Sequence, residues 1–445
     1  MKQITNKVLW LFAVGQFGWS LLSGIISSWM VYYYTGEGAV FGSHITGEPL
    51  FLGLTLFGLI IAVGRLFDAV TDPLIAGWSD RSDFKGGRRI PFMKVIAIPF
   101  ALVTVGVFLF PSTGNVVLND IILFVTLMLF YLFMTIYCTP YNALIAELGD
   151  TQEHRVNVST YISFTYIAGF SVSYLLPNIA SLFEGSMGKA GAVRLAIGLL
   201  AALAAIAMLV PSFFIKERDY IEVKPVKTQA FRSLIKTFSN GQFRRFVYSD
   251  VIYFFAVTLF QTGLAFYITK LMHADESNAF LLTVIMTVVS LCLYPAVNKL
   301  APKFGKKPLI TIGFFTYAAV FLLASFCGEG IVWGYIIAAL AGIPMAILGI
   351  LPQAVVADIA EADGIESGES RSGMFFAART FAMKLGQALS LLVFTSVTVS
   401  GSEESYRVTA IIATVACLVG AILFFLYNEK SVMAKITKKE DTPDA

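Results

Sequence analysis

Three ionisable residues, Arg65, Asp68 and Asp72, follow one another in an apolar stretch of the sequence. In a helix, Asp68 lies about 60° and Asp72 about 20° from Arg65 around the axis, so the three side chains share one face. Two carboxylates four residues apart repel each other unless a cation lies between them, and hard cations such as sodium prefer oxygen ligands. The pattern therefore predicts a site for sodium or for a proton. The alternative, an Arg65–Asp68 ion pair that only joins helices, leaves the second aspartate unexplained.

A further charged position is Lys384, the twelfth residue of an apolar stretch over 373–399. Its side chain lies too far from both ends of this stretch to reach water easily. A buried ammonium needs a carboxylate partner, and the aspartates near Arg65 are candidates; a helix-joining ion pair with no other role is the alternative. Arg379 lies nearer to the start of the stretch, and we expect it to reach the membrane surface.

A run of polar side chains over 135–142 is broken by a proline. Hydroxyls and freed backbone groups inside a membrane are tolerated where they line a cavity. For any single Ser or Thr the alternative is a hydrogen bond to its own helix. The cluster predicts a solute cavity lined by Tyr137, Cys138, Tyr141 and Asn142, and we expect Gln387, close to Lys384, to line it as well.

The composition shows which elements position these residues. The chain has 445 residues, of which 57% are hydrophobic and 14% charged, with a mean hydropathy of +0.76, whereas soluble proteins average about 25% charged residues. A helix needs about 20 apolar residues to cross a bilayer. Twelve stretches qualify, at 8–34, 51–77, 92–111, 118–146, 158–183, 191–215, 246–272, 276–298, 308–327, 331–356, 373–399 and 406–428. The sequence predicts an all-α polytopic membrane protein with twelve transmembrane helices. Its net charge of +3 argues against a nucleic-acid partner.

The basic residues predict the orientation of these helices. Of the 32 Lys and Arg residues, 25 lie at the two ends of the chain or in the even-numbered connections, and four lie in the odd-numbered ones. Cytoplasmic connections carry the excess of Lys and Arg. Both termini are therefore expected to be cytoplasmic.

The two halves of the chain carry similar basic turns. Gly87-Arg88-Arg89-Ile90-Pro91 follows the second stretch, and Gly305-Lys306-Lys307-Pro308 follows the eighth, 218 residues later. This echo predicts two pseudo-symmetric six-helix bundles, although any short cytoplasmic turn tends to be basic. The bundles are expected over 1–215 and 246–428, with a cytoplasmic central loop over 216–245 and a cytoplasmic tail over 429–445.

These features resemble the glycoside-pentoside-hexuronide:cation symporter family of the major facilitator superfamily, whose best-known member is the melibiose carrier. The resemblance covers nearly the whole chain and implies the major facilitator fold. It rests on Tyr32-Tyr33-Tyr34-Thr35, Gly64-Arg65 through Asp72-Pro73, Gly87-Arg88-Arg89 with Pro91, Thr139-Pro140-Tyr141, Ala357-Asp358-Ile359-Ala360-Glu361, and Lys384-Leu385-Gly386.

The resemblance implies roles for several residues. The family's cation site falls on Asp68 and Asp72, with a hydroxyl from Thr135. Lys384 matches the lysine that neighbours this site, and we assign it a coupling role together with Arg65. A cytoplasmic gate is implied in which Arg155 meets Asp358 and Glu361 when the carrier faces outward.

At the sugar-binding positions of the family, this chain carries other residues than the melibiose carrier. Ser20 stands in place of an aspartate, Cys138 and Asn142 replace an aspartate and a tryptophan, and Ser163 replaces an arginine. A galactoside held by two carboxylates is therefore not expected, and the four positions are instead candidates to line the cavity for another solute.

The expected function is cation-coupled symport of a sugar or glycoside by alternating access, driven by sodium or protons. A lysophospholipid or other amphiphile is the alternative substrate within the same family. A membrane prenyltransferase is a second alternative, because aspartates spaced by four can hold magnesium and a diphosphate; its chemistry needs acidic motifs in both halves. We expect no enzyme activity, no cofactor beyond Na+ or H+ and a functional monomer. The expected location is a membrane, which for a bacterial protein is the cytoplasmic (inner) membrane.

Overall fold

The computed structural model describes residues 4–35, 40–50, 54–82, 84–148, 152–220, 237–367 and 372–440. The chain divides into two compact units, Met1–Thr228 and Gln229–Ala445. The described residues are almost entirely helical, and their only extended pairings are two isolated bridges. An all-α protein was expected from the length and hydropathy of the apolar stretches, and the structure confirms it.

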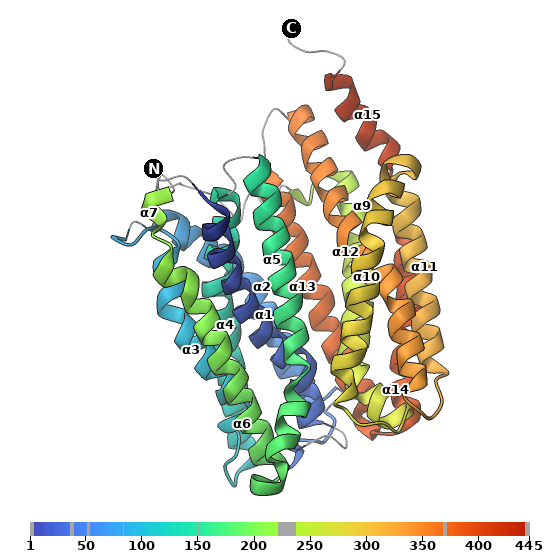
Figure 1. Ribbon diagram of the computed structural model, residues 1–445. Helices are drawn as coiled ribbons and strands as arrows, with labels where there is room; N and C mark the ends of the chain where they lie inside the picture. The colour runs from blue at the N-terminus through green and yellow to red at the C-terminus, as the bar shows by residue number, and fades with distance from the viewer. Residues whose placement is uncertain are drawn as a thin grey trace. The chain divides into compact units, whose positions relative to one another are not determined.

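The described residues of unit 1 form six long helices and two short ones (Figure 1). They are α1 (Asn6–Tyr34), η1 (Gly42–His44), α2 (Leu56–Arg81), α3 (Ile90–Leu109), α4 (Val116–Leu148), α5 (Gln152–Ser173), α6 (Leu176–Phe214) and α7 (Glu217–Tyr220). Except between α5 and α6, the helices fall within a few residues of the predicted stretches.

Gly188 interrupts α6. Its φ of 71° and ψ of 165° are far from helical values, and glycine adopts this conformation without a steric penalty. The first part of α6 follows α5 after a short break at Tyr174 and Leu175, and the chain reverses direction between the two parts of α6, where Gly188 lies (Figure 1). The predicted stretches 158–183 and 191–215 therefore correspond to α5 with the first part of α6, and to its second part.

Unit 2 contains the second set of long helices. They are α9 (Gly241–Phe266), the π-helix η3 (Tyr267–Leu271), α10 (Asn278–Phe304), α11 (Lys306–Ser325), α12 (Val332–Ser367), α13 (Ser372–Val397), η4 (Thr398–Ser400), α14 (Glu403–Phe424) and α15 (Glu429–Glu440). Asn240 caps α9, because its Oδ1 accepts hydrogen bonds from the backbone N–H groups of Gln242 and Phe243, both at 3.0 Å. Helix α9 thus begins inside the segment expected as central loop, and α15 occupies most of the expected tail.

Ten helical stretches in the described residues are long and apolar enough to cross a membrane. The stretch over 160–214 contains both crossings on either side of Gly188. Helix α2 is not among the ten, and it is the helix that carries Arg65, Asp68 and Asp72. Counting the two parts of the 160–214 stretch separately and including α2 gives the twelve crossings expected from the sequence.

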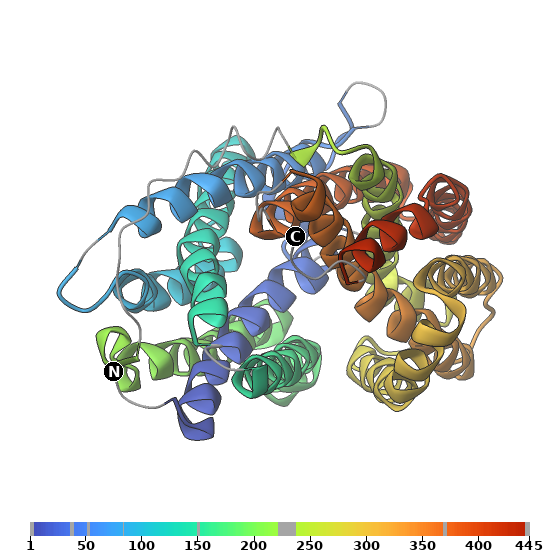
Figure 2. The same ribbon diagram turned by 90° about the horizontal axis from the view of Figure 1, so that it is seen from above.

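The two units repeat one packing pattern. In unit 1, α1 packs against α5 and α6, α4 packs against α2 and α3, and α3 also packs against α6. In unit 2, α9 packs against α13 and α14, α12 packs against α10 and α11 (Figure 2), and α11 also packs against α14. Each unit 1 contact therefore has its counterpart eight labels later, which is the arrangement that an internal duplication produces.

The duplicated basic turns are each bound by one carboxylate. In unit 1, Glu217 of α7 accepts hydrogen bonds from the backbone N–H groups of Arg88, Arg89 and Ile90, at 2.7, 2.7 and 2.9 Å. In unit 2, Glu429 of α15 accepts from the backbone N–H groups of the two lysines that begin α11, at 2.7 and 2.9 Å. A carboxylate at a helix N-terminus satisfies N–H groups that have no partner within the helix.

A glycine makes room for each carboxylate. Gly87 and Gly305 have φ of 117° and 88°, and a Cβ atom at either position would lie 2.4 or 3.0 Å from Oε2 of the bound glutamate. The echo that is visible in the sequence is thus a geometry that the two halves share. The two glutamates that complete it were not expected from the sequence.

Glu217→Gln is expected to lower the free energy of unfolding by about 2 kcal/mol, because hydrogen bonds to a charged acceptor are worth roughly 1.5–3 kcal/mol. Glu217 is 1% exposed, and a glutamine would turn an N–H donor towards the backbone N–H groups. The thermal midpoint of the purified protein measures this effect. Glu184→Gln, at an exposed position of α6, is the control and should leave the midpoint unchanged; equal midpoints for both variants would contradict the prediction.

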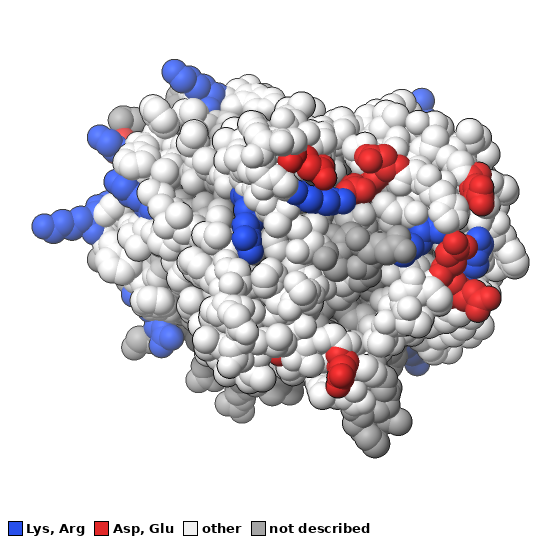
Figure 3. Space-filling view, turned by 90° about the horizontal axis from the view of Figure 1, so that it is seen from below, with Lys and Arg blue, Asp and Glu red and all other residues white. Residues whose placement is uncertain are grey.

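Acidic side chains predominate on one face of unit 2. The connections α9–α10, α11–α12 and α13–α14 carry Asp275, Glu276, Glu329, Glu403 and Glu404. Figure 3 shows this face, on which red patches of Asp and Glu lie together with blue patches of Lys and Arg. The basic turn of unit 2 lies between α10 and α11, in a connection of the other set. The cytoplasmic placement of both termini stays a prediction.

Candidate functional site

The charged face of α2 is directed into unit 1. Asp68 is completely buried, Arg65 is 9% exposed, and Asp72 is half-buried. Helix α2 packs against α4, which carries the polar run over 135–142. The predicted charged face and the predicted polar run therefore meet at one helix–helix contact.

Two threonines of α4 face the two aspartates of α2. Thr135 Oγ1 donates a hydrogen bond to Asp68 Oδ1 at 2.7 Å. One turn further on, Thr139 Oγ1 donates to Asp72 Oδ1 at 3.5 Å, a longer and weaker contact. Both pairs have a spacing of four residues, so the helices present two matched rungs of carboxylate and hydroxyl oxygens.

Thr71 adds a second hydroxyl to the rung formed by Asp68 and Thr135. Its Oγ1 lies 3.1 Å from the backbone oxygen of Asp68 and 3.4 Å from Thr135 Oγ1. Carboxylate, hydroxyl and backbone oxygens are the ligands that a hard cation prefers. The arrangement can hold sodium, or it can hold a proton on Asp68. Thr71 and Thr139 were not predicted from the sequence, although the spacing of four from Thr135 to Thr139 was a usable signal.

Arg65 lies over an aromatic ring of α4. Its guanidinium carbon is 5.1 Å from the centroid of the Tyr131 ring, a distance at which a cation is attracted to the ring face. Gly64 allows this close approach, because a Cβ atom there would lie 2.5 Å from the Tyr131 ring. The arginine thus places a positive charge on the same helix face as the two carboxylates.

Tyr137 and Tyr141 join α4 to its neighbours. Both are fully buried. The Tyr137 hydroxyl donates to the backbone oxygen of Met208 on α6, and the Tyr141 hydroxyl donates to that of Phe12 on α1, each at 2.9 Å. These hydroxyls connect three helices of unit 1, and the expectation that they contact the solute stays a prediction.

The other expected cavity residues differ in their surroundings. Ser20 is fully buried, and its Oγ donates to the backbone oxygen of Phe17 at 3.0 Å. Asn142 and Ser163 are exposed, and Cys138 is half-buried. Gln387 is half-buried on α13 and therefore belongs to unit 2.

An aromatic pair that was not expected from the sequence lies next to Ser20. Trp19 of α1 and Tyr166 of α5 have ring centroids 5.6 Å apart, and Trp19 Nε1 donates to Gln16 Oε1 at 3.2 Å. Tyr166 is 39% exposed and lies close enough to Arg65 and Cys138 to interact with them electrostatically. The pair therefore joins α1 to α5 within unit 1.

Lys384 is 7% exposed on α13, so its side chain is buried within the protein, and its expected depth in the membrane stays a prediction. Its expected partnership with the aspartates of α2 joins residues of different units and stays a prediction. Arg379 does not reach the membrane surface as expected. It is buried beside Asp250 of α9, and Nε and Nη2 donate to the two carboxylate oxygens at 2.8 and 3.0 Å. Asp250 was not expected as its partner, because the two residues lie 129 positions apart in the chain.

Two of the expected gate residues, Asp358 and Glu361, lie in the last third of α12. Asp358 of α12 forms an ion pair with Lys306 in the basic turn of unit 2, and Glu361 is exposed. The side chain of Arg155 lies outside the described residues. Asp358 thus joins α12 to α11 within its own unit, and the expected contact with Arg155 stays a prediction.

Comparison with known proteins identifies the family. The model of the family described as MFS/sugar transport protein matches residues 11–438 of this chain. The chain belongs to that family. It is therefore a multi-pass membrane transporter of the major facilitator superfamily and not an enzyme, so the prenyltransferase alternative is discarded.

Two relatives and one solved structure illustrate this membership. The putative glycoside/cation symporter YagG of Escherichia coli is 24% identical over 413 residues, 89% of this chain and 84% of that protein. The sodium-dependent lysophosphatidylcholine symporter 1 of Xenopus tropicalis is 22% identical over 439 residues, 88% and 82% of the two chains. The fold is similar to that of a bacterial homologue of the human lysosomal transporter Spinster in an inward-facing conformation, with a TM-score of 0.67, 14% identity and 97% of both chains covered.

Proposed function

We propose that this transporter is a symporter that couples the entry of sodium or protons to the uptake of a sugar or glycoside. The observation that carries the proposal is the buried Asp68 carboxylate that accepts a hydrogen bond from Thr135 across the α2–α4 contact. A carboxylate buried within a membrane helix usually marks an ion or substrate pathway. Together with Asp72 it supplies oxygen ligands for one cation.

The proposed mechanism links the cation to the solute through charge. Without the cation, the like charges of Asp68 and Asp72 repel each other, and bound sodium or a proton removes this repulsion. The two α4 hydroxyls of the rungs lie on the helix that also carries Cys138 and Asn142, so ordering α4 orders part of the solute site. Each ligand then raises the affinity for the other by the same factor, about 5-fold to 150-fold.

The aromatic pair favours a sugar ring as the solute. The Trp19 and Tyr166 rings lie 5.6 Å apart, Trp19 binds the Gln16 amide, and exposed Ser163 lies one turn before Tyr166 on α5. Apolar surface with a few well-placed polar groups is the usual composition of a small-molecule site. YagG, named as a glycoside/cation symporter, supports this choice of substrate. Transport by a monomer in a bacterial cytoplasmic membrane completes the proposal.

The second candidate substrate is a lysophospholipid, which the relative named as a lysophosphatidylcholine symporter supports. A panel of pentosides, hexosides and lysophospholipids, each tested with sodium, with potassium and at two pH values, separates the two. A ligand that binds the folded state raises the thermal midpoint. We expect a glycoside to stabilise the protein more when the coupling cation is present. Stabilisation by lysophospholipids alone would replace the sugar proposal with the lipid one.

Trp19→Ala is expected to raise the half-saturation concentration for the stabilising glycoside by about twofold to twelvefold, because an aromatic stacking contact is worth roughly 0.5–1.5 kcal/mol beyond its buried area. Trp10→Ala is a matched control, since Trp10 also lies on α1 and stacks on an α5 ring, that of Tyr161, at 4.2 Å. The control should keep the wild-type value in the same uptake assay. Equal changes in both variants would indicate a general loosening of the α1–α5 contact.

A further inference from the structure

The ion pair of Asp250 and Arg379 joins α9 to α13 inside unit 2. The two side chains are 3% and 11% exposed, and the guanidinium binds both carboxylate oxygens at once. A two-point contact of this kind fixes direction as well as distance. A single Lys–carboxylate contact would leave the lysine free to rotate about one bond.

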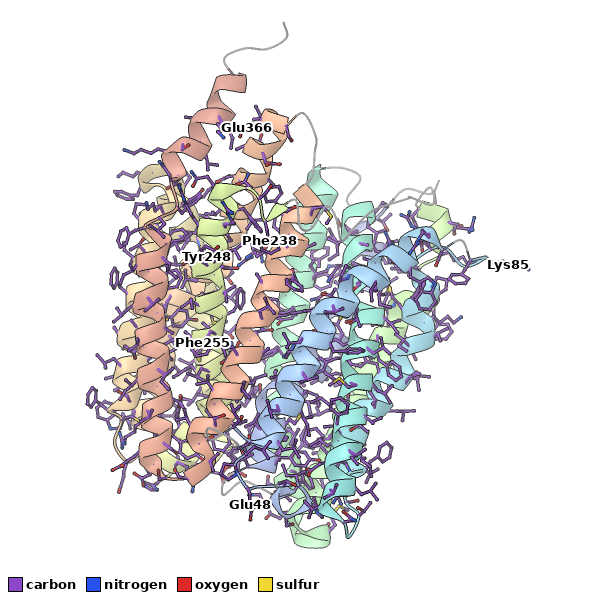
Figure 4. The ribbon with its side chains drawn as sticks, turned by 180° about the vertical axis from the view of Figure 1, so that it is seen from behind. Glu48, Lys85, Phe238, Tyr248, Phe255 and Glu366 are labelled. Carbon is purple, nitrogen blue, oxygen red and sulfur yellow. The ribbon has the colours of Figure 1, made fainter. Side chains whose placement is uncertain are left out.

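Aromatic rings of α9 hold the guanidinium on both sides of the carboxylate. The guanidinium carbon lies 5.9 Å from the Phe246 ring centroid and 5.7 Å from the Phe254 ring centroid. These residues are one turn before and one turn after Asp250, so all three lie along one side of α9. Tyr248 and Phe255, labelled in Figure 4, mark the same segment of the helix. These contacts thus fix the position of the Arg379 guanidinium both along α9 and around its axis.

The α13 face that carries Arg379 is in close contact with α9 over three turns. Phe375, one turn before Arg379, packs edge to face on Phe243 with ring centroids 5.1 Å apart. Gly386 lies two turns after Arg379, and a Cβ atom there would be 2.4 Å from the backbone oxygen of Val251. The helices touch at their backbones near Gly386, a contact that has no directional bond of its own.

A buried ion pair is a poor device for stability alone. Removing two charges from water costs several kcal/mol per ion, and well-packed apolar residues often serve equally well or better. Apolar residues are abundant in this chain, and the retained ion pair needs another reason. Its best-attested role in proteins is to specify one register among several that are similarly packed.

Lys384 lies on the opposite side of α13 from this contact. It precedes Gly386 by two residues, or 200° around the helix, and follows Arg379 by five, or about 140°. The side chain of Lys384 therefore projects away from α9 whenever Arg379 is bound to Asp250. A rotation of α13 by one residue, about 100°, would change that direction completely.

We propose that Asp250 and Arg379 are positioning residues for cation coupling, which fix the rotation of α13 on α9 and thereby the direction in which Lys384 projects. This inference rests on the proposed cation-coupled transport and on the coupling role of Lys384. Asp250 and Arg379 lie outside the cation site and do not bind the cation. They affect the cation concentration that transport requires.

The decisive variant replaces both members of the pair by apolar residues, Asp250→Leu with Arg379→Met. No unpaired charge remains, so the thermal midpoint should stay close to the wild-type value. We expect the cation concentration for half-maximal uptake to rise at least about fivefold, the lower end of typical coupling between sites. An unchanged value in the folded double variant would overturn the proposal.

A second comparison shows whether the pair acts through Lys384. In a Lys384→Gln background, removing the pair should produce no additional change in the cation requirement, because the side chain that it directs is already absent. Multiplied effects of the two sets of substitutions would show that the pair acts independently of Lys384 and would overturn the proposal. Glu366→Gln is the control for a lost ion pair in unit 2, since Glu366 (Figure 4) binds Lys435 at an exposed position, and it should leave the cation requirement unchanged.

A third measurement reports the rotation of α13 without any transport. Cysteines replace Phe243 and Phe375 in a chain in which the four native cysteines, Cys138, Cys292, Cys327 and Cys417, are changed to serine or alanine. Oxidative cross-linking between the two positions should be slower when the pair is removed. Equal cross-linking rates with and without the ion pair would refute the positioning role. Cross-linking does not depend on whether uptake needs a cation, so this result is independent of a failure of the proposed function.

Arg379→Lys keeps the test decisive if the double variant does not fold. Lysine preserves the positive charge but makes one contact in place of the planar two-point fork. The cross-linking rate and the cation concentration for half-maximal uptake should both lie between the wild-type values and the values expected after loss of the ion pair. A cation requirement equal to that of the wild type, with slower cross-linking, would overturn the link between rotation and coupling.

Discussion

Replacing Asp68 by asparagine is expected to abolish cation-stimulated uptake while the protein stays folded. Asp68 is fully buried and accepts its hydrogen bond from Thr135 through Oδ1, and an asparagine can accept the same bond through its amide oxygen. The substitution removes the negative charge that would bind sodium or a proton, so coupling between cation and solute is lost. We expect uptake driven by an inward sodium or proton gradient to fall at least about tenfold in reconstituted vesicles, in the middle of the usual range of coupling factors.

Asp120→Asn is the matched control for this experiment. Asp120 is an aspartate near the start of α4, 7% exposed, which accepts hydrogen bonds from the backbone N–H group and the hydroxyl of Thr46. It lies away from the two rungs, and its variant should keep the response to the gradient. Full gradient-driven uptake by the Asp68 variant, under sodium and under proton gradients, would refute the cation site.

Gly169→Ala is expected to be the most destabilising small change in unit 1. A Cβ atom at this position would lie 2.2 Å from Ser20 Oγ and 2.3 Å from the backbone oxygen of Phe17. The serine can turn, but the backbone of α1 cannot move without separating α1 from α5. Overpacking of this kind costs about 1–3 kcal/mol. The separation also displaces Tyr166, three residues earlier on α5, from Trp19, so glycoside uptake should fall together with the thermal midpoint.

Gly198→Ala makes the same chemical change where there is room. Gly198 lies in the second part of α6, and a Cβ atom added there would meet no heavy atom within 4 Å beyond its chain neighbours and its own helix backbone. Alanine is favoured over glycine inside a helix by about 0.5–1 kcal/mol, so this variant should be equally stable or more stable. A thermal midpoint for Gly169→Ala at or above that of Gly198→Ala would show that the α1–α5 contact tolerates an extra methyl group.

The helices and their number could be predicted from the sequence because they depend on local properties. The length of an apolar stretch and the cost of a charge in lipid are both properties of neighbouring residues. Helical periodicity likewise places Arg65, Asp68 and Asp72 on one face of α2. The boundary between α5 and α6 was not predicted, because Gly188 places the reversal of the chain within a continuous helical segment.

Long-range contacts account for what was missed. Arg379 was expected to reach the surface because its position in the stretch allowed it, whereas the structure pairs it with Asp250 of another helix. Glu217 and Glu429 gave no signal as partners of the basic turns, because they lie more than a hundred residues from those turns. Only packing brings such residues together.

The sequence by itself determined the class of this protein, the positions of its membrane helices and the presence of ionisable groups within these helices. Each of these follows from hydropathy and helical periodicity within one segment. The resemblance implied Thr135 as one hydroxyl of the site, and its hydrogen bond to Asp68 agrees with that expectation. Tertiary structure alone decided the other partners: Thr139 for Asp72, the Tyr131 ring for Arg65, and Asp250 for Arg379. The reason is physical. A buried charge requires compensation, but which of several candidate helices supplies it depends on the contacts that packing creates.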